Sequence, residues 1–144
     1  MLTALSIRDI VLVDRLDLEV GSGLTVLTGE TGAGKSIILD ALGLALGARS
    51  DAGLVRSGAT QAVATATFDT PTDADWLAEA RDKGLEVEAG QDLILRRVLG
   101  ADGRSRAFIN DQAVGVNALR SLAQGLVEVH GQHETVGLLD ARTH

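Results

Sequence analysis

Several residue types are scarce or missing in this chain of 144 residues. It has no cysteine, which excludes disulfide bonds and thiolate metal sites. Two phenylalanines and one tryptophan are its only aromatic residues, so its core must be built from Leu, Val, Ile and Ala. No apolar run reaches a membrane-spanning length, and no signal-peptide layout opens the sequence. The cytoplasm is therefore the expected location.

Basic residues are in the minority as well. The chain has 13 Lys and Arg against 20 Asp and Glu, which gives a formal net charge of −7. Binding to phosphate backbones needs a basic surface, so any contact with DNA would require a local patch or another part of an assembly. A hydrophobic content of 45% with 23% charged residues is typical of one folded domain.

The most informative segment is residues 29–36, which match the phosphate-binding pattern G-x-x-x-x-G-K-[ST]. An apolar stretch typical of a strand precedes this segment, and an apolar stretch typical of a helix begins near Lys35. Three glycines allow successive backbone N–H groups to point at phosphate oxygens, and the helix N-terminus adds its positive dipole end. The residues expected to bind nucleotide are Gly29, Glu30, Thr31, Gly32, Ala33, Gly34, Lys35 and Ser36.

Two of these residues have side chains with specific chemistry. The Lys35 ammonium is expected to reach the β- and γ-phosphates of ATP, and the Ser36 hydroxyl is expected to bind Mg²⁺. The alternative is a glycine turn that merely joins a strand to a helix, and the strand–loop–helix context of the motif disfavours it.

Hydrophobic periodicity predicts an alternation of strands and helices around this loop. The segments expected to be strands are 2–10, 15–20, 24–28, 62–69, 92–99, 104–110 and 126–129. The segments expected to be helices are 35–46, 73–83 and 116–124. Asp14 is expected in a turn between the first two strands, Gly47 at a helix C-terminus, and Trp76 as a packing residue.

The hairpin formed by 92–99 and 104–110 is rich in arginine. It carries Arg96, Arg97, Arg104 and Arg106. They could be solvated strand residues that offset nearby acids, or a basic patch for DNA or a protein partner. The sequence leaves both readings open.

A complete ATPase needs more than a phosphate cradle. Hydrolysis requires an acidic residue on Mg²⁺ and a group that positions the attacking water. In this class of protein these groups normally follow four apolar residues as Asp and often Glu, and no such run occurs here. The residues 137–140 are too short a match, and an ABC-type signature is also absent. We therefore expect nucleotide binding without efficient turnover, and a fragment that forms the first lobe of a larger enzyme.

Four segments together resemble one protein family. These are residues 7–9, 29–41, 103–110 and 130–134, the last reading His-Gly-Gln-His-Glu. Their combination is similar to the RecN family, SMC-like bacterial ATPases of DNA double-strand-break repair. The resemblance implies an α/β fold of the P-loop NTPase class, an ABC/SMC-type ATPase head lobe with an antiparallel β portion. It also implies that 1–144 is the N-terminal lobe only, without the coiled coil and the C-terminal lobe.

The same resemblance implies partners and further site residues. Two heads of this kind sandwich ATP, so the expected partners are ATP, the C-terminal lobe, a second head and DNA. Gln132 resembles the Q-loop glutamine, which contacts Mg²⁺ and the attacking water. Arg49 resembles an SMC-type arginine that reaches the phosphates or senses DNA, with Arg56 as the alternative. His130 and His133 are read as hydrogen-bonding groups near Gln132 rather than a zinc site, since cysteines and an acid cluster are missing.

Two other functions compete with a repair ATPase. The ATP-binding subunit of an ABC transporter usually stacks adenine on an aromatic near its first strands, and none precedes Phe68. A small-molecule kinase is disfavoured by the strand pair before the loop and by the Gln132 segment. A head that is nucleoid-associated within the cytoplasm fits the resemblance better.

Overall fold

The computed structural model describes residues 2–11, 13–19, 32–49 and 52–130. For 32–36 and 127–130 it describes the backbone only. The strands are β1 (Leu2–Ile10), β2 (Val13–Glu19), β3 (Gln61–Asp69), β4 (Asp92–Gly100), β5 (Ser105–Ile109) and β6 (Gln112–Val114). The helices are α2 (Gly32–Ala45), the short 3-10 helix η1 (Ala52–Leu54), α3 (Ala74–Asp82) and α4 (Val116–His130).

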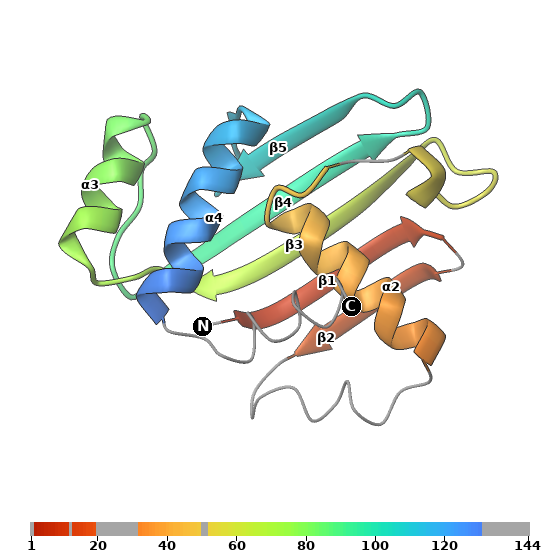
Figure 1. The fold of residues 1–144 in the computed structure, drawn as a ribbon, viewed down its shortest axis with the longest axis horizontal. Helices are drawn as coiled ribbons and strands as arrows, with labels where there is room; N and C mark the ends of the chain where they lie inside the picture. Colours follow the sequence, from red (N-terminus) through yellow and green to blue (C-terminus); the bar gives the residue numbers. More distant parts are fainter. Residues whose placement is uncertain (1, 12, 20–31, 50–51, 131–144) are drawn as a thin grey trace.

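The strands form one antiparallel sheet in the order β2-β1-β3-β4-β5-β6 (Figure 1). The pairing aligns residues that face the same side of the sheet: Ile7 lies opposite both Leu16 on β2 and Ala64 on β3. Side chains alternate between the two faces along each strand. In β3 this gives a regular sequence of buried and partly buried positions.

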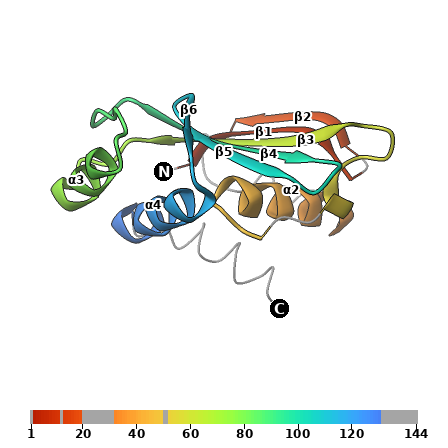
Figure 2. The ribbon, with the colours of Figure 1, turned by 90° about the horizontal axis from the view of Figure 1, so that it is seen from above.

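The sheet has one covered and one open face. Figure 2 shows α2 and α4 on the same side of the sheet, with no described helix on the other side. The buried residues of the strands point towards these helices and form the core with them. The largest fully buried side chains are Ile7, Ile10, Leu42, Leu44, Phe68, Leu93, Leu95, Leu99, Ile109, Leu119, Leu122 and Leu126. The expected aliphatic core is confirmed.

Trp76 joins α3 to α4. Its ring is buried, and its Nε1–H donates a hydrogen bond of 3.0 Å to the backbone oxygen of Leu122. A Cβ at Gly125 would lie 3.2 Å from Trp76 Cδ1, so glycine at this position lets the indole pack against α4. The expected packing role of Trp76 is thus confirmed. Asp73 caps the N-terminus of α3 by accepting the N–H groups of Asp75 and Trp76.

Several predicted boundaries are confirmed, and two are wrong. Residues 126–129 do not form a strand, because α4 continues to His130. The helical spacing of the buried residues Leu119, Leu122, Ala123 and Leu126 explains this extension, since it places all four on one face. Asp14 lies within β2 rather than in a turn.

Two further differences are smaller. The helix after the phosphate loop begins at Gly32, three residues before Lys35, and the short strand β6 was not predicted. The predicted strand 24–28 lies outside the described residues. In the ranges that the structure describes, no helix is both long and apolar enough to cross a membrane.

Candidate nucleotide-binding site

The last residues of the phosphate-loop motif form the start of α2. The helix begins at Gly32, so the backbone of Gly32 to Ser36 lies in its first turns. No acidic residue occupies the first turn. The free N–H groups and the positive dipole end at a helix N-terminus favour an anion, and the first turn itself brings no carboxylate to them. This part of the chain therefore fits a phosphate group.

Several residues of the predicted nucleotide site are not described by the structure, or are described by their backbone alone. Gly29, Glu30 and Thr31 lie outside the described residues, as does Gln132. For Lys35 and Ser36 the structure describes the backbone but not the side chains. In the sequence, Gln132 follows His130, the last residue of α4, by two positions. The side chain of His130 is likewise not described, and His133 lies outside the described residues.

Helix α2 is anchored in the core along its described length. From Ile38 to Leu46 nearly every side chain is buried, as expected from a helix that is apolar nearly all round. It packs against β3 with further contacts to β1 and β4. Burial on several sides restrains the helix axis, which fixes where its N-terminal turn points.

The C-terminus of α2 is closed by a glycine. Gly47 has φ of +96°, and the N–H of Ala48 donates to the oxygen of Gly43 at 2.8 Å. This is the hydrogen-bond pattern of a Schellman cap, which requires a left-handed residue after the helix. The predicted cap is confirmed. A Cβ at Gly47 would also lie 2.8 Å from the Cα of Arg120, so α4 passes too close for any other residue.

Arg97 binds this helix end from the sheet. Its side chain is 2% exposed, and its Nη1 donates to the backbone oxygens of Leu44 at 3.1 Å and Ala48 at 2.9 Å. Its Nε donates to Ser105 Oγ at 2.6 Å. Burial lowers the pKa of the Arg97 guanidinium, and the positive charge of Arg120 lowers it further. A positive charge at a helix C-terminus is favourable because the carbonyl dipoles point at it.

Arg120 binds the same helix end from α4. Its Nε donates to the backbone oxygen of Gly47 at 2.9 Å. Two guanidinium groups from different elements therefore hold the carbonyl end of the helix that begins in the phosphate loop. We call Arg97 and Arg120 the helix clamp.

The two candidate loop arginines have different surroundings. Arg49 follows α2 and its side chain is exposed. Arg56 lies at the end of the next turn. Its Nη1 is 3.8 Å from Asp9 Oδ1, and its backbone N–H donates to the backbone oxygen of Asp9 at 2.8 Å. Arg56 is thus tied to the end of β1, whereas Arg49 stays a prediction as a nucleotide or DNA contact.

The arginine side chains of the hairpin lie on different faces of the sheet. Arg97 faces the helices and is buried, so it belongs neither to a basic patch nor to the solvated surface. The clue in the sequence was its register, because Arg97 stands in phase with the buried Leu93, Leu95 and Leu99 of β4. A charged residue in the apolar phase of a strand indicates a buried polar contact. Sequence reasoning missed this contact, and no pattern in α4 pointed to Arg120.

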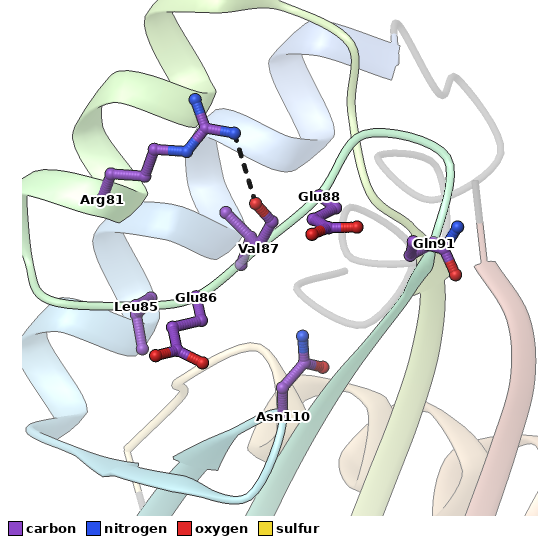
Figure 3. Close-up of a pocket in the computed structure, with 7 residues that line it drawn as sticks. All are labelled: Arg81, Leu85, Glu86, Val87, Glu88, Gln91 and Asn110. Carbon is purple, nitrogen blue, oxygen red and sulfur yellow. Dashed lines mark hydrogen bonds between the residues drawn. The ribbon is translucent and has the colours of Figure 1, made fainter.

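Figure 3 shows a hollow between α3, the segment before β4 and the turn from β5 to β6. It is lined by Arg81, Leu85, Glu86, Val87, Glu88, Gln91 and Asn110, none of which belongs to the predicted site. The Arg81 guanidinium donates to the Val87 oxygen at 3.3 Å, and the Asn110 side chain accepts the N–H of Ile94 at 2.8 Å. With two glutamates and with Arg81 already bonded, this hollow does not suit a nucleotide phosphate.

Comparison with known proteins agrees with this geometry. Residues 4–110 match the family model of the AAA domain. The chain belongs to the AAA domain family. The DNA repair protein RecN of Vibrio cholerae is 47% identical over 133 residues, which are 92% of this chain and 24% of that protein. RecN of Xylella fastidiosa strain Temecula1 is 44% identical over 146 residues, covering 99% of this chain and 25% of that protein. The RecN resemblance is therefore confirmed, and the chain spans about a quarter of these relatives.

Solved structures show the same fold. A structure from a study of ATP-driven dimerization and DNA-stimulated activation of SMC ATPases superposes with a TM-score of 0.64 at 18% identity, covering 99% of both chains. The recombination mediator RecF with a bound ATP analogue gives a TM-score of 0.58 at 13% identity, over 83% of this chain and 29% of that one. The predicted class, an α/β P-loop NTPase head lobe of ABC/SMC type, is confirmed. The ABC transporter alternative is not favoured.

Proposed function

We propose that residues 1–144 are the N-terminal, ATP-binding lobe of a RecN-type DNA repair ATPase head. In this proposal the coiled coil and the C-terminal lobe belong to a longer protein, as the length of the relatives suggests. The observation that supports the proposal is the position of the phosphate-loop motif in the fold. The Gly-Lys-Ser end of the phosphate loop opens a buried helix whose first turn is free of acids.

The chain's own residues have distinct roles in this site. The backbone N–H groups of residues 29–36 would bind the phosphate oxygens, and Lys35 would place a positive charge beside the β- and γ-phosphates. Ser36 and Gln132 would hold Mg²⁺, and Gln132 would also orient the attacking water. Arg49 would reach the phosphates from the loop after α2. When bound, Mg²⁺ neutralises the charge that develops on the transferred phosphoryl group.

Hydrolysis would need parts that this chain does not carry. The catalytic acid and the signature would come from the C-terminal lobe and from a second head, so ATP would hold two heads together and hydrolysis would release them. Full turnover would serve the recombinational repair of DNA double-strand breaks, in the cytoplasm at the nucleoid. The SMC neighbour, whose study names ATP-driven dimerization, is consistent with this arrangement.

The substitution Lys35→Ala tests the phosphate site. Removing the point charge on the phosphates should weaken ATP binding by at least about 100-fold, measured by isothermal titration calorimetry with Mg²⁺. The matched control is Lys83→Ala, because Lys83 is the chain's other lysine and is exposed at the end of α3. Equal ATP affinities of the two variants would contradict the proposal.

A second test concerns turnover. The 144-residue chain alone should show negligible Mg²⁺-dependent ATP hydrolysis, since the acid that binds Mg²⁺ is absent from its sequence. Adding the C-terminal part of the longer protein should restore hydrolysis in a phosphate-release assay. Rapid hydrolysis by the 144-residue chain would mean that a catalytic acid lies within it.

A further inference from the structure

Two arginines of the β4–β5 hairpin, Arg96 and Arg106, lie on the open face of the sheet, whereas Arg97 lies on the covered face. The register places Arg96 opposite Phe108 and Val98 opposite Arg106, so these four side chains share one face of the sheet. Val63 on β3 lies opposite Val98 and joins them. The residue after Arg96, Arg97, bonds α2 from the other face, which is the face that α2 and α4 cover (Figure 2). Arg96 and Arg97 are consecutive residues, but only Arg96 is directed to the open face.

This face is hollowed along β3, β4 and β5. One hollow is lined by Gln61, Val63, Arg96, Val98, Arg106 and Phe108. A second hollow lies at the hairpin end and is lined by Asp102 and Arg104 among others, and Gln61 and Arg106 line both hollows. We call these two adjoining hollows together the arginine groove.

The charges in the arginine groove are mostly uncompensated. Arg96 and Arg106 form no ion pair within the described part of the chain, whereas Arg104 is 3.7 Å from Asp102. The Arg96 guanidinium lies 4.5 Å from the centroid of the Phe108 ring, and its buried Nε has no hydrogen-bond partner. Stacking on an aromatic ring holds a guanidinium in place without using its hydrogen-bond donors. The ring thus holds the Arg96 guanidinium in place, and its outer nitrogens have no hydrogen-bond partner in the described part of the chain, whereas the buried Nε is not accessible to a ligand.

We propose that the arginine groove binds the phosphate backbone of DNA. This rests on the proposed function as a repair ATPase, and it adds the surface that the DNA would contact. Guanidinium groups match phosphate geometry and offer paired donors, and backbone contacts of this kind do not depend on base sequence. In a chain with a net charge of −7, a local cluster of uncompensated arginines is the feature that such binding requires.

The groove lies over β3, β4 and β5, away from the edge strand β2. On its other side it reaches the edge of the sheet, because β6 pairs only with Ala107 to Ile109 and leaves Arg106 on β5 without a neighbouring strand. Because Arg96 and Arg106 alternate with the buried Arg97 and Ala107, the groove lies on the face opposite to α2, the helix that begins in the phosphate loop and covers the other side of the sheet (Figure 2). DNA bound there would leave the nucleotide site unobstructed.

The double variant Arg96→Gln/Arg106→Gln tests this surface in the complete protein, with this chain joined to its C-terminal part. Binding to a fluorescein-labelled 40-base-pair duplex is measured by fluorescence anisotropy at several salt concentrations without nucleotide. We expect affinity to fall by about ten-fold at 0.1 M salt, and the slope of log K against log salt to shrink by roughly 1.8, the loss of two phosphate contacts. The variant Arg96→Lys/Arg106→Lys keeps the charge and should keep most of the slope.

A matched control removes the same charge elsewhere. Arg81→Gln/Lys83→Gln, at the C-terminal end of α3, should leave both the affinity and the salt slope close to those of the unaltered protein. If the groove variant binds DNA like this control, the proposal is overturned. It is also overturned if the groove variant keeps its DNA affinity but loses binding to poly-glutamate, which would identify an acidic protein partner instead.

The two proposals fail in different ways. ATP affinity of the groove variant should equal that of the unaltered protein, whereas Lys35→Ala should lose ATP but keep nucleotide-free DNA binding. Loss of DNA binding with normal ATP binding would support the groove. Normal DNA binding together with absent ATP binding in the unaltered protein would instead contradict the proposed function.

Discussion

The two faces of the sheet use arginine in opposite ways. On the covered face, Arg97 is 2% exposed and donates to the carbonyl oxygens at the end of α2. On the open face, the next residue back in the chain, Arg96, lies over Phe108 with its Nε unpartnered. Both residues have the same chemistry and stand on the same strand. The difference shows that the partner of an arginine, and not its presence in a basic run, decides what it does.

The largest effect is expected from Arg97→Met. This change withdraws the donors of two backbone oxygens and of Ser105 Oγ, and should lower the free energy of unfolding by about 3 kcal/mol. Arg96→Met removes only the contact with Phe108, which is worth less than about 1 kcal/mol. Urea unfolding of the two variants measures the difference. Equal losses would mean that Arg97 does not hold α2 as described.

A smaller effect is expected where α2 meets α4. Gly47→Ala should lower the free energy of unfolding by about 2 kcal/mol, because φ is +96° and the new Cβ would meet the backbone of Arg120. Gly58→Ala is the control, since φ there is +88° but nothing lies within 4 Å of the added Cβ. It should cost about 1 kcal/mol, from backbone strain alone. If thermal unfolding shows the same loss for both, the close approach of Arg120 has no energetic weight.

The smallest effect is expected on the open face, at Asp17 on β2. Hydrogen bonds from Ser6 Oγ and then from Arg8 hold the pKa of this carboxyl at about 2, below its ordinary value of 3.8. Because the folded-state pKa is depressed, the stabilisation is present above pH 3.8 and is lost as the pH falls towards 2. Asp17→Asn should therefore be slightly less stable than the unaltered protein at neutral pH, and the difference should shrink as the pH falls from 3.8 towards 2. An NMR titration of the Asp17 carboxyl that gives an ordinary pKa would remove the basis of this expectation.

How much of the fold could be read from the sequence depended on the element. The strands β1 to β5 were predicted, because alternating apolar residues between glycines and polar turns have few other readings. The last turns of α4 were not, since four consecutive residues, Leu126 to Val129, suit a buried strand as well as a helix. Packing decided the matter: Leu126 continues the face that begins at Leu119, and Gly125 gives room to Trp76. Such a contact between distant parts of the chain has no local signal.

The candidate site divides in the same way. The phosphate loop was identified from residues 29–36 alone, because the chemistry of a phosphate cradle requires those residue types at that spacing. The roles of Gln132 and Arg49 stay predictions. The helix clamp was not foreseen, because Arg97 and Arg120 lie 23 positions apart in the numbering and meet only where β4 and α4 both reach the end of α2.

By itself, the sequence determined the phosphate-loop motif, the aliphatic core and the RecN resemblance, since each depends on residue types at short, regular intervals. Only the tertiary structure decided which arginines are buried and which form the groove. In a strand, one step along the chain moves a side chain from one face to the other, and the faces differ only in what packs against them. The placement of α2 and α4 on one side of the sheet therefore gave Arg96 and Arg97 their separate roles.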